Sequence, residues 1–316
     1  MTQYIIRRLL LLIPVILIVG VVVFTLVHLT PGDPAAVILG PDATSEQVER
    51  LRSQLGLDRP FYIQFVEWMG GVARGDLGHS LYLDIPVTQA LLDRAQPTTT
   101  LMLYSLTISI LIGVPIGVLS AIKPNSIFDR IAMMFAISGV AIPNFVLGIL
   151  LIMIFAVWLR VLPSQGYVGL FQDPIGHFER MIMPAFSLGF SSAALLARLV
   201  RSSMLDVMRE DYVRTALSKG VAFRNVITQH ALRNALIPAV TVIGYSVGAL
   251  LGGAVVTETV FGLPGMGRLV VNSIGRRDYP VIQGAVMLIA VFYLLANLIV
   301  DILYVYIDPR IRYGDE

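Results

Sequence analysis

Cysteine is absent from the 316-residue chain, and charged side chains are scarce. The lack of cysteine excludes disulfides and thiolate metal sites. Charged residues make up 14% of the sequence, against roughly 25% in an average soluble domain. The net charge of +2 is too small to indicate a nucleic-acid-binding protein. The four histidines lie in separate segments without clustered acids, so the sequence offers no zinc or di-iron site.

Charge is missing from six long stretches of the sequence. They are 9–27, 101–122, 131–159, 182–197, 235–256 and 281–300. Each approaches or exceeds the roughly 20 helical residues that cross a bilayer core, and the first is too long for the apolar part of a secretory signal. The runs are continuous, whereas strands of a membrane barrel alternate apolar and polar residues. The sequence therefore predicts an all-α membrane protein with six transmembrane helices.

Two of these stretches have features that predict irregular spans. The shortest is followed directly by Arg198 and Arg201. It reaches full length if Met204 and Leu205 extend the helix while both arginine side chains reach back to the membrane surface. The longest contains Pro143 near its middle, which removes a helical hydrogen bond and predicts a kink. A broken helix often lines a transport pathway; a kink that neighbouring helices tolerate is the alternative.

Lysine and arginine are unevenly distributed between the loops. The segments on the side that includes both termini contain 13 of them, against 5 in the two short loops of the other side. Because basic loops stay in the cytoplasm, we expect both termini there. The chain would then comprise an N-terminal helix (1–30), an extracytoplasmic loop region (31–97), a core of five membrane helices (98–308) and a cytoplasmic tail (309–316).

The long extracytoplasmic loop is expected to be structured. Thr44 and Gln47 fit a capping box that starts a helix over 45–55, and Gly56 stands where a C-cap glycine would. A second amphipathic helix, Phe61–Val72, would lie on the membrane surface or on neighbouring helices. A packing cap without a partner is the alternative to a functional role for this loop.

Glycines recur at four-residue spacing in two of the predicted helices. Gly244, Gly248 and Gly252 share one face of the fifth helix, and Gly113 and Gly117 repeat the pattern in the second. A helix face of bare backbone permits close packing of helices in a membrane. We therefore expect close helix contacts at these faces.

Enzyme motifs give no support for catalysis by this chain. Residues 244–248 match G-x-S-x-G, which marks a serine hydrolase on a strand-turn-helix elbow. Ser246 lies in a continuous apolar run, where no such elbow forms, so the hydrolase interpretation is rejected. No G-x-x-x-x-G-K-[ST] occurs, so the chain has no Walker A loop for ATP phosphates.

The segment 205–234, on the cytoplasmic side of the predicted orientation, is rich in basic residues. Asp211–Lys219 has helical spacing, Gly220 interrupts it, and Phe223–Leu232 resumes it. An apolar stripe on the second helix must be covered, either by the chain's own helix ends or by a soluble partner that takes the helices into a groove. The stripe consists of Phe223, Val226, Ile227 and Ala231.

Several sequence blocks carry a resemblance to a known family. In the basic segment they are Arg214-Thr215-Ala216-x-x-Lys219-Gly220 and His230-Ala231-Leu232-Arg233-Asn234-Ala235. Elsewhere they are Pro31-Gly32-Asp33-Pro34, Gly75-Asp76-Leu77-Gly78-x-Ser80, Pro264-Gly265-x-Gly267-Arg268, Arg277-Asp278-Tyr279-Pro280 and Asp308-Pro309-Arg310. The basic segment resembles the EAA loop of binding-protein-dependent ABC importers. The general EAA motif has an acidic residue at the position of Arg214. The peptide-type branch of the family has arginine there, as this chain does. Together the blocks resemble the first permease subunit of the dipeptide/oligopeptide type.

The resemblance implies a type I ABC importer permease fold, with a large extracytoplasmic loop and a cytoplasmic coupling helix pair. It implies assembly in a bacterial inner membrane with a homologous second permease subunit, two cytoplasmic ABC ATPase subunits and an extracytoplasmic binding protein. ATP and Mg²⁺ would be bound by the ATPase subunits, and this chain would hold no cofactor or metal of its own.

By the same resemblance, the helices around Gly220 fit a cleft of an ATPase subunit and pass its movement to the fourth and fifth membrane helices. The implied coupling residues are Asp211, Arg214, Thr215, Ala216, Lys219, Gly220, Phe223 and His230. Gly220 would supply the turn, and Ala216 would allow close approach. Arg214 and Lys219 would meet acidic or carbonyl groups. His230 is expected to be solvated or to cap its helix.

The resemblance also places the loop after the fifth helix near the outer mouth of the pathway. The candidates for an outer gate or docking loop are Glu258, Phe261, Pro264, Gly265, Gly267 and Arg268. A structural re-entrant turn is the alternative. Because a charge at bilayer depth costs about 2.5–3.5 kcal/mol, Glu258 is expected to face water or a partner.

The solute is the least determined property. Polar side chains in the predicted helices would wet a cavity or bond a neighbouring helix; these pathway candidates are Asn144, Ser191, Ser192, Tyr245 and Gln283. Peptides are expected, and permeases of this kind also carry glutathione or chelated nickel. A stand-alone channel or secondary transporter is the alternative of a different class. Such a protein is expected to place acidic or basic residues inside its membrane helices, and the six stretches contain no Asp, Glu, Lys or Arg.

Overall fold

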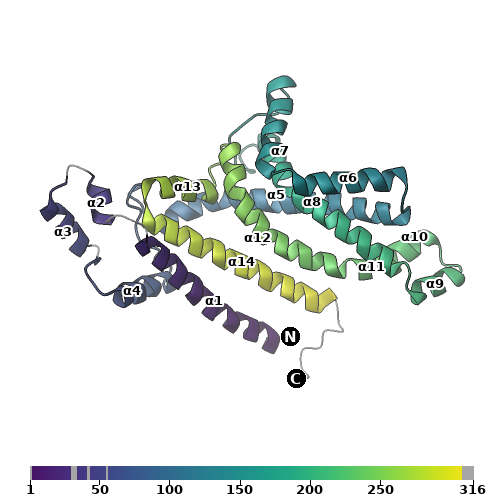
Figure 1. Cartoon of the computed structure of the whole chain (residues 1–316), viewed down its shortest axis with the longest axis horizontal. Helices are drawn as coiled ribbons and strands as arrows, with labels where there is room; N and C mark the ends of the chain where they lie inside the picture. The colour runs from purple at the N-terminus through teal and green to yellow at the C-terminus, as the bar shows by residue number, and fades with distance from the viewer. Residues whose placement is uncertain (1, 30–33, 41–42, 55, 308–316) are drawn as a thin grey trace. The chain divides into compact units, whose positions relative to one another are not determined.

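The computed structural model describes residues 2–29, 34–40, 43–54 and 56–307 (Figure 1). The helices begin with α1 (Thr2–Leu29), α2 (Pro34–Leu39), α3 (Ser45–Gln54), α4 (Phe61–Ala73), α5 (Val87–Ile122), α6 (Ile127–Ala141), α7 (Asn144–Leu151) and the π-helical η1 (Ile152–Trp158). They continue with α8 (Pro174–Val207), α9 (Asp211–Ser218), α10 (Phe223–Asn225), the π-helical η2 (Val226–Ala231), α11 (Leu232–Ala235), α12 (Ile237–Val260), α13 (Met266–Arg276) and α14 (Tyr279–Ile307). Within the described ranges, extended backbone pairs only in an isolated bridge between His79 and Pro86.

The chain forms two compact units. One consists of Met1–Gln96 with Arg268–Leu294, and the other of Pro97–Gly267 with Leu295–Glu316. The first unit contains α1 to α4 and most of α13, and the second contains α6 to α12. The boundaries fall within α5 and α14, so each of these two long helices belongs in part to both units.

The predicted membrane spans agree with the helices. Five helices are long and apolar enough to cross a membrane, namely α1, α5, α8, α12 and α14. The pair formed by α6 with α7 and η1 has the composition of a sixth span, broken by a bend of 106°. Each of the six charge-free stretches lies largely within one of these elements, which confirms the all-α membrane fold.

The shortest predicted span is part of the long helix α8. Pro174 begins this helix at a position where its missing N–H costs nothing. The Asp173 carboxylate caps it by accepting a hydrogen bond from the backbone N–H of Gly176 at 3.0 Å. At the other end the helix includes Met204, which is fully buried, and runs on to Val207. The predicted extension is confirmed.

The break between α6 and α7 follows from the proline in the third span. Ile142 adopts an extended conformation, with φ −87° and ψ 120°, as a residue before proline prefers. Pro143 then precedes the first residue of α7 with φ −59° and ψ 139°. The predicted kink is confirmed, and Figure 1 shows α7 turned sharply away from α6.

The second unit packs around α8. One buried cluster gathers Leu101, Leu188, Leu250 and Phe261, and another gathers Leu196, Val200, Met204 and Ala231. The glycines of α5 bring its backbone against α8: a Cβ at Gly113 would lie 2.7 Å from the Ala193 carbonyl oxygen, and one at Gly117 would lie 2.6 Å from that of Ala197. The predicted close packing at these two glycines is therefore confirmed.

The glycine face of α12 is only partly covered within its unit. A Cβ at Gly244 would lie 2.7 Å from the side chain of Val300. At Gly252 a Cβ would find no atom within 4 Å. Ser246 donates a hydrogen bond to the Val242 carbonyl oxygen of its own helix at 2.8 Å, as expected of a serine in a continuous helix.

The first unit confirms that the long loop after α1 is structured. Thr44 and Gln47 form the predicted capping box, in which the N–H of Thr44 reaches the Gln47 side chain at 2.9 Å and the N–H of Gln47 reaches the Thr44 hydroxyl at 3.3 Å. Gly56 has the left-handed φ of +67° expected of a C-cap glycine. The amphipathic helix α4 packs on a neighbouring helix, because Phe65 and Trp68 contact the ring of Phe24 in α1.

A buried aspartate joins two distant sequence blocks of the first unit. Asp278 is 2% exposed and accepts hydrogen bonds from the Ser80 hydroxyl at 2.5 Å and from the backbone N–H groups of Leu81 and Tyr82 at 3.2 and 3.3 Å. The Ser80 oxygen in turn accepts from the N–H of Leu83 at 2.9 Å. This network fixes the loop that precedes α5.

Candidate functional site

The helix α9 is a short helix whose two ends are set by local sequence signals. It begins at Asp211, whose carboxylate in the first turn suits the partial positive charge of a helix N-terminus. At the other end, Gly220 adopts φ +79°. This left-handed residue lets the N–H of Val221 reach the Ala216 carbonyl oxygen at 3.2 Å. The predicted helix and its glycine break are confirmed.

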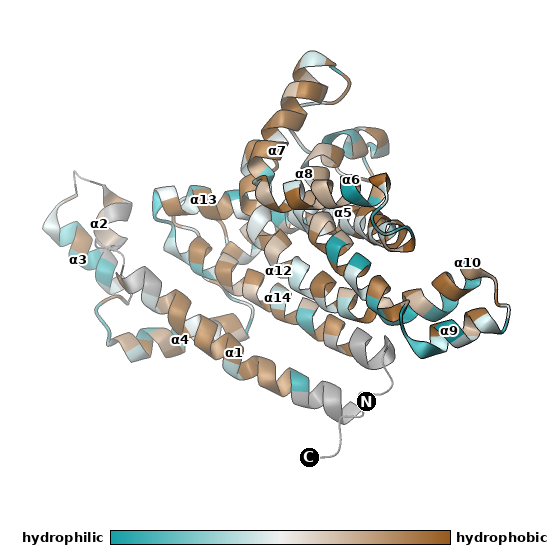
Figure 2. Ribbon diagram, turned by 45° about the vertical axis from the view of Figure 1, so that its right-hand side comes forward, coloured by the Kyte–Doolittle hydropathy of each residue, from teal (hydrophilic) through white to brown (hydrophobic). Residues whose placement is uncertain are grey.

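The predicted coupling residues gather on and beside α9, and most are exposed. Asp211, Arg214, Thr215, Lys219, Gly220, Phe223 and His230 are exposed, and Ala216 is half-buried. Arg214 pairs with Asp211 at 3.8 Å, with both side chains largely in solvent, so this ion pair contributes little to stability. Figure 2 shows hydrophilic residues on α9, in contrast with the hydrophobic α7. The exposed charges of α9 are available to a partner.

Hydrogen bonds attach α9 to the helix that follows it. The Tyr212 hydroxyl donates to the His230 carbonyl oxygen at 3.4 Å and accepts from the Asn234 amide at 2.8 Å. Val213, the next residue, is fully buried. α9 and α10 lie side by side beyond the ends of α8 and α11 (Figures 1 and 2). The pair is therefore a connected element rather than two independent segments.

The apolar stripe of the second helix is covered mainly by the chain itself. Val226 and Ala231 are fully buried, and Ile227 is 7% exposed. Ile227 and Ala231 belong to the cluster around Met204. Phe223 alone of the four is exposed, at 48%. Of the two interpretations of the stripe, packing on the chain's own helix ends holds for three residues, and only Phe223 remains for a partner.

An ion pair that the sequence analysis missed anchors α6 to α8 near this element. Asp129, whose side chain is 4% exposed, accepts hydrogen bonds from Arg201 Nε at 2.6 Å and Nη2 at 2.7 Å. Its carboxylate also accepts from the N–H of Asn125 at 2.8 Å, and its own N–H donates to the Ser126 hydroxyl at 3.2 Å. The spacing Ser126-x-x-Asp129 is a local capping signal, but nothing in the sequence indicated that Arg201 pairs with Asp129.

The candidate outer gate contains a buried hydrogen-bonded turn. Glu258 is fully buried, and its carboxylate accepts a hydrogen bond from the Thr98 hydroxyl at 2.5 Å. The Thr98 oxygen accepts in turn from the N–H of Met266 at 2.8 Å, and the N–H of Leu263 reaches the Glu258 carbonyl oxygen at 2.9 Å. Glu258, which was expected to face water or a partner, is therefore hydrogen-bonded to Thr98 of the same chain.

Most of the other candidates in this turn are also buried. Phe261 is 2% exposed, and Gly265 and Gly267 are buried against the Glu258 side chain, where a Cβ would meet its carboxylate. Pro264 and Arg268 are exposed. The turn has the features of the structural alternative, and its exposed residues are the ones that a partner or a moving gate can use.

The predicted pathway residues differ in their surroundings. Tyr245 of α12 is 67% exposed, and Ser191 and Ser192 of α8 are half-buried. Asn144 at the start of α7 points toward α12, since a Cβ at Gly253 would lie 3.5 Å from its amide nitrogen. These four belong to the second unit. Gln283 belongs to the first unit and is 7% exposed, enclosed by other side chains.

Histidine does not form a metal site in the part of the chain that the structure describes, where no group of three potential ligands occurs. His177 is fully buried, with Nδ1 2.6 Å from the Val168 carbonyl oxygen and Nε2 3.2 Å from the Tyr104 hydroxyl. It is a satisfied core histidine. His230 is exposed, as expected.

Comparisons with known proteins agree along the whole chain. The sequence profile described as "Binding-protein-dependent transport system inner membrane component" matches residues 113–313, and the profile of its N-terminal region matches 1–103. The probable peptide ABC transporter permease protein y4tP of Sinorhizobium fredii is 46% identical over 313 residues, covering 99% of this chain and all of the relative. The glutathione transport system permease protein GsiC of Escherichia coli (strain K12) is 45% identical over the same length and coverage.

A solved structure supports the fold independently. A chain of the MetNI methionine ABC transporter in an inward-facing conformation matches with a TM-score of 0.57 and 18% sequence identity. The match covers 70% of this chain and 97% of that chain. At this level of identity the similarity establishes the type I permease fold and nothing about the solute.

Proposed function

This chain belongs to the family of binding-protein-dependent transport system inner membrane components and is a permease subunit of an ABC importer; from that premise, we propose that it forms half of a transmembrane pathway for peptides. The other half is a homologous second permease subunit. An extracytoplasmic binding protein delivers the peptide, and two cytoplasmic ABC ATPase subunits bind ATP and Mg²⁺ and supply the energy. This chain lacks a Walker A motif, which fits that division of labour.

The observation that carries the proposal is the exposed helix α9. Its charged residues Asp211, Arg214 and Lys219 are turned to solvent, and they make no buried contact that the fold requires. A cleft on an ATPase subunit would receive α9, with Arg214 and Lys219 bound to acidic or carbonyl groups. Phe223, exposed at the start of the second helix, would enter the same cleft as an apolar anchor.

The attachments of α9 explain how movement of the ATPase would reach the pathway. α9 follows α8 after only three residues, and Tyr212 ties it to Asn234 at the entrance to α12. Asp129 and Arg201 join α8 to α6. A displacement of α9 would therefore act on α8, α12 and α6 together. Such coupling requires two states with different contacts.

The proposed sidedness places α9 in the cytoplasm together with both termini, as the distribution of Lys and Arg predicts. The turn after α12 would then lie on the outer side. There Pro264 and Arg268 are its exposed residues, and they would contact the binding protein or form the rim of a gate. Tyr245, exposed on α12, is the foremost candidate for the pathway lining.

Peptides and glutathione are equally consistent candidates for the solute. The two relatives described above are named for a peptide permease and a glutathione permease at nearly the same identity. Glutathione is itself a tripeptide, so small peptides are the shared chemistry; chelated nickel remains a further candidate. Competition for uptake of a labelled dipeptide by unlabelled dipeptides, oligopeptides, glutathione and a nickel chelate would rank them. Failure of every peptide to compete would contradict the proposal.

The coupling role is tested at Gly220. The variant Gly220→Val forces a β-branched residue into φ +79°, although no neighbouring atom lies within 4 Å of the new Cβ, so the substitution acts through the local backbone. We expect reduced uptake relative to ATP hydrolysis by the assembled complex. Gly40→Val is the matched control, because Gly40 has φ +82° and equally open surroundings in the N-terminal loop. Unchanged uptake and unchanged substrate-stimulated hydrolysis in Gly220→Val would remove this turn from the mechanism.

A second experiment separates the proposal from a self-sufficient transporter. The purified chain alone and the chain assembled with ATPase subunits are placed in vesicles, and uptake is measured with and without ATP. Uptake only by the assembly with ATP is expected. ATP-independent uptake by the lone chain would assign it to the channel or secondary transporter class.

A further inference from the structure

Two arginines of α8, three residues apart, have opposite surroundings. Arg201 is bound to Asp129 through two hydrogen bonds, and its side chain is 24% exposed. Arg198 is exposed, and it makes no ion pair or side-chain hydrogen bond with any residue that the structure describes. A guanidinium keeps its charge at every physiological pH. Arg198 is therefore a positive charge that no residue in the described part of the chain neutralises.

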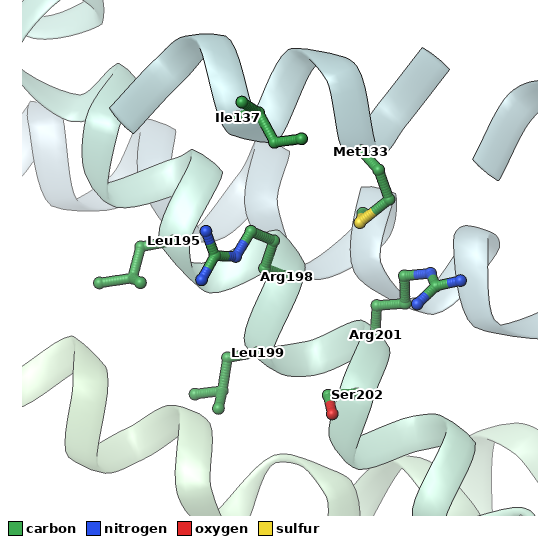
Figure 3. A pocket seen from close by; sticks show the side chains of 7 residues that line it. All are labelled: Met133, Ile137, Leu195, Arg198, Leu199, Arg201 and Ser202. Carbon is green, nitrogen blue, oxygen red and sulfur yellow. The ribbon is translucent and has the colours of Figure 1, made fainter. Parts of the chain in front are cut away.

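Arg198 lies at a pocket between α6 and α8 with a volume of ≈ 540 Å³. Figure 3 shows the Arg198 and Arg201 side chains leaving α8 in opposite directions, with Arg198 on the side of Leu195. The lining residues are Met133, Ile137, Leu195, Arg198, Leu199, Arg201 and Ser202. Ser202 is four residues after Arg198 on the same helix and is also exposed, so both side chains share one face of α8.

The pocket is polar at one end and apolar at the other. The pair of Asp129 with Arg201 joins the beginning of α6 to the last turns of α8, so the two helices run in opposite directions there. Farther along α6 lies Ile137, and farther back along α8 lies Leu195; they are 62% and 42% exposed. The charged end of the pocket therefore lies toward the end of α8 that leads to α9, and the apolar end lies toward the middle of the membrane helices.

We propose that this pocket binds an anionic phospholipid. The phosphate of its headgroup accepts hydrogen bonds from the Arg198 guanidinium and the Ser202 hydroxyl, and an acyl chain covers Ile137 and Leu195. Guanidinium groups suit phosphate geometry, and basic pockets between membrane helices on the cytoplasmic side bind anionic headgroups. A peptide fits the pocket less well, because its amide groups would lose water against the apolar end without gaining partners. The inference rests on the proposed function only for the cytoplasmic sidedness of this end.

The test uses the assembled transporter in a neutral detergent. Phosphatidylglycerol or phosphatidylcholine is titrated, and the lipid molecules bound per complex are counted by native mass spectrometry. We expect the wild type to prefer phosphatidylglycerol and Arg198→Gln to bind it about fivefold more weakly, as loss of one basic contact near the membrane surface predicts. Arg198→Lys should keep most of the preference. Arg130→Gln removes an exposed arginine of α6 outside the pocket lining and should behave as the wild type.

Several outcomes would overturn the inference. Equal binding of phosphatidylglycerol by the wild type and Arg198→Gln would show that the pocket holds no headgroup. Displacement of the lipid by a dipeptide would assign Arg198 to the transport pathway, and displacement by inorganic phosphate alone would assign it to a soluble anion. Loss of the second permease subunit from the Arg198→Gln complex, with lipid binding unchanged, would assign it to a subunit interface. Lipid binding is measured without ATP or transport, so failure of the proposed function would be seen separately.

Discussion

Asp211 in α9 and Glu258 at the end of α12 are both carboxylates at helix ends, in opposite environments. The Asp211 side chain is 98% exposed and its ion pair with Arg214 is long, at 3.8 Å. Glu258 is fully buried and holds Thr98 at 2.5 Å, in a turn that closes on Gly265 and Gly267. The comparison separates two kinds of motif residue: exposed charges that the fold does not need, and buried ones that build the fold.

A third carboxylate, Asp129, provides the first test of this comparison. It is buried, and it pairs with Arg201 in the last turns of α8, the helix that leads to α9. If burial decides the effect on stability, Asp129→Ala should destabilise the protein at least as much as any change in the turn after α12. It leaves the Arg201 guanidinium without its counter-charge, and loss of one partner of a buried pair costs about 3–5 kcal/mol. Denaturant unfolding of the solubilised complex measures the loss. The double variant Asp129→Ala/Arg201→Met should recover part of it, and a loss below about 1 kcal/mol in the single variant would contradict the structural role.

The turn after α12 gives the next largest effect. Gly265→Ala places a Cβ on the Glu258 carboxylate, and overpacking of this kind costs roughly 1–3 kcal/mol. Gly252→Ala is the matched control in the same unit, because no atom lies within 4 Å of the added carbon. The midpoint of thermal loss of the monodisperse complex should fall for the first variant and stay in place for the second. Equal behaviour of the two would mean that the turn is not closed on Glu258.

A smaller loss of stability is expected when the hydrogen bond between α9 and α11 is removed. Asn234→Ala removes the hydrogen bond to the Tyr212 hydroxyl at 2.8 Å, which is worth about 1 kcal/mol. α9 should then become more mobile while the membrane helices keep their stability. Hydrogen exchange over Asp211–Ser218 measures this directly. Thr228→Ala removes an exposed hydroxyl of η2 that bonds the Arg224 carbonyl oxygen four residues earlier, and it should leave the exchange unchanged. Equal exchange in both variants would show that the bond does not hold α9.

The smallest effect on stability is expected for Arg214→Gln. Its ion pair is exposed, and such pairs contribute roughly 0–1 kcal/mol. Uptake by the assembled complex should nevertheless fall, because the proposed contact with the ATPase is lost. Arg209→Gln, another exposed arginine that precedes α9, serves as the control of equal charge change. Full uptake in Arg214→Gln would remove Arg214 from the coupling surface.

Local signals in the sequence predicted several of the elements accurately, although the helix α13 formed within a segment expected to be a loop. The capping pair Thr44 and Gln47, the break at Pro143 and the turn at Gly220 are all where the pattern placed them. These features depend on the conformational preferences of a few neighbouring residues, which act in the same way whatever the chain does elsewhere. The absence of charge from six stretches predicted the spans for a similar reason, because the bilayer selects composition directly.

The burial of individual polar residues could not be read in this way. The sequence alone predicts that Glu258 faces water or a partner and that the Arg201 side chain reaches the membrane surface. Each instead meets a side chain far along the chain, Thr98 at a separation of 160 residues and Asp129 at 72. No local pattern encodes such a pairing, since it exists only once the helices are packed.

The amino-acid sequence by itself determined where the chain is apolar, where several of its helices begin, bend or end, and which family its motif blocks match, because these properties depend on near neighbours and on the solvent. Only the tertiary structure decided that Val226, Ile227 and Ala231 pack inward while Phe223 stays exposed. It also distinguished two arginines of α8, since Arg201 pairs with a carboxylate on another helix and Arg198 pairs with none among the described residues. The sequence specifies which residues are charged, and the fold decides which of these charges are neutralised, because it determines which side chains come together.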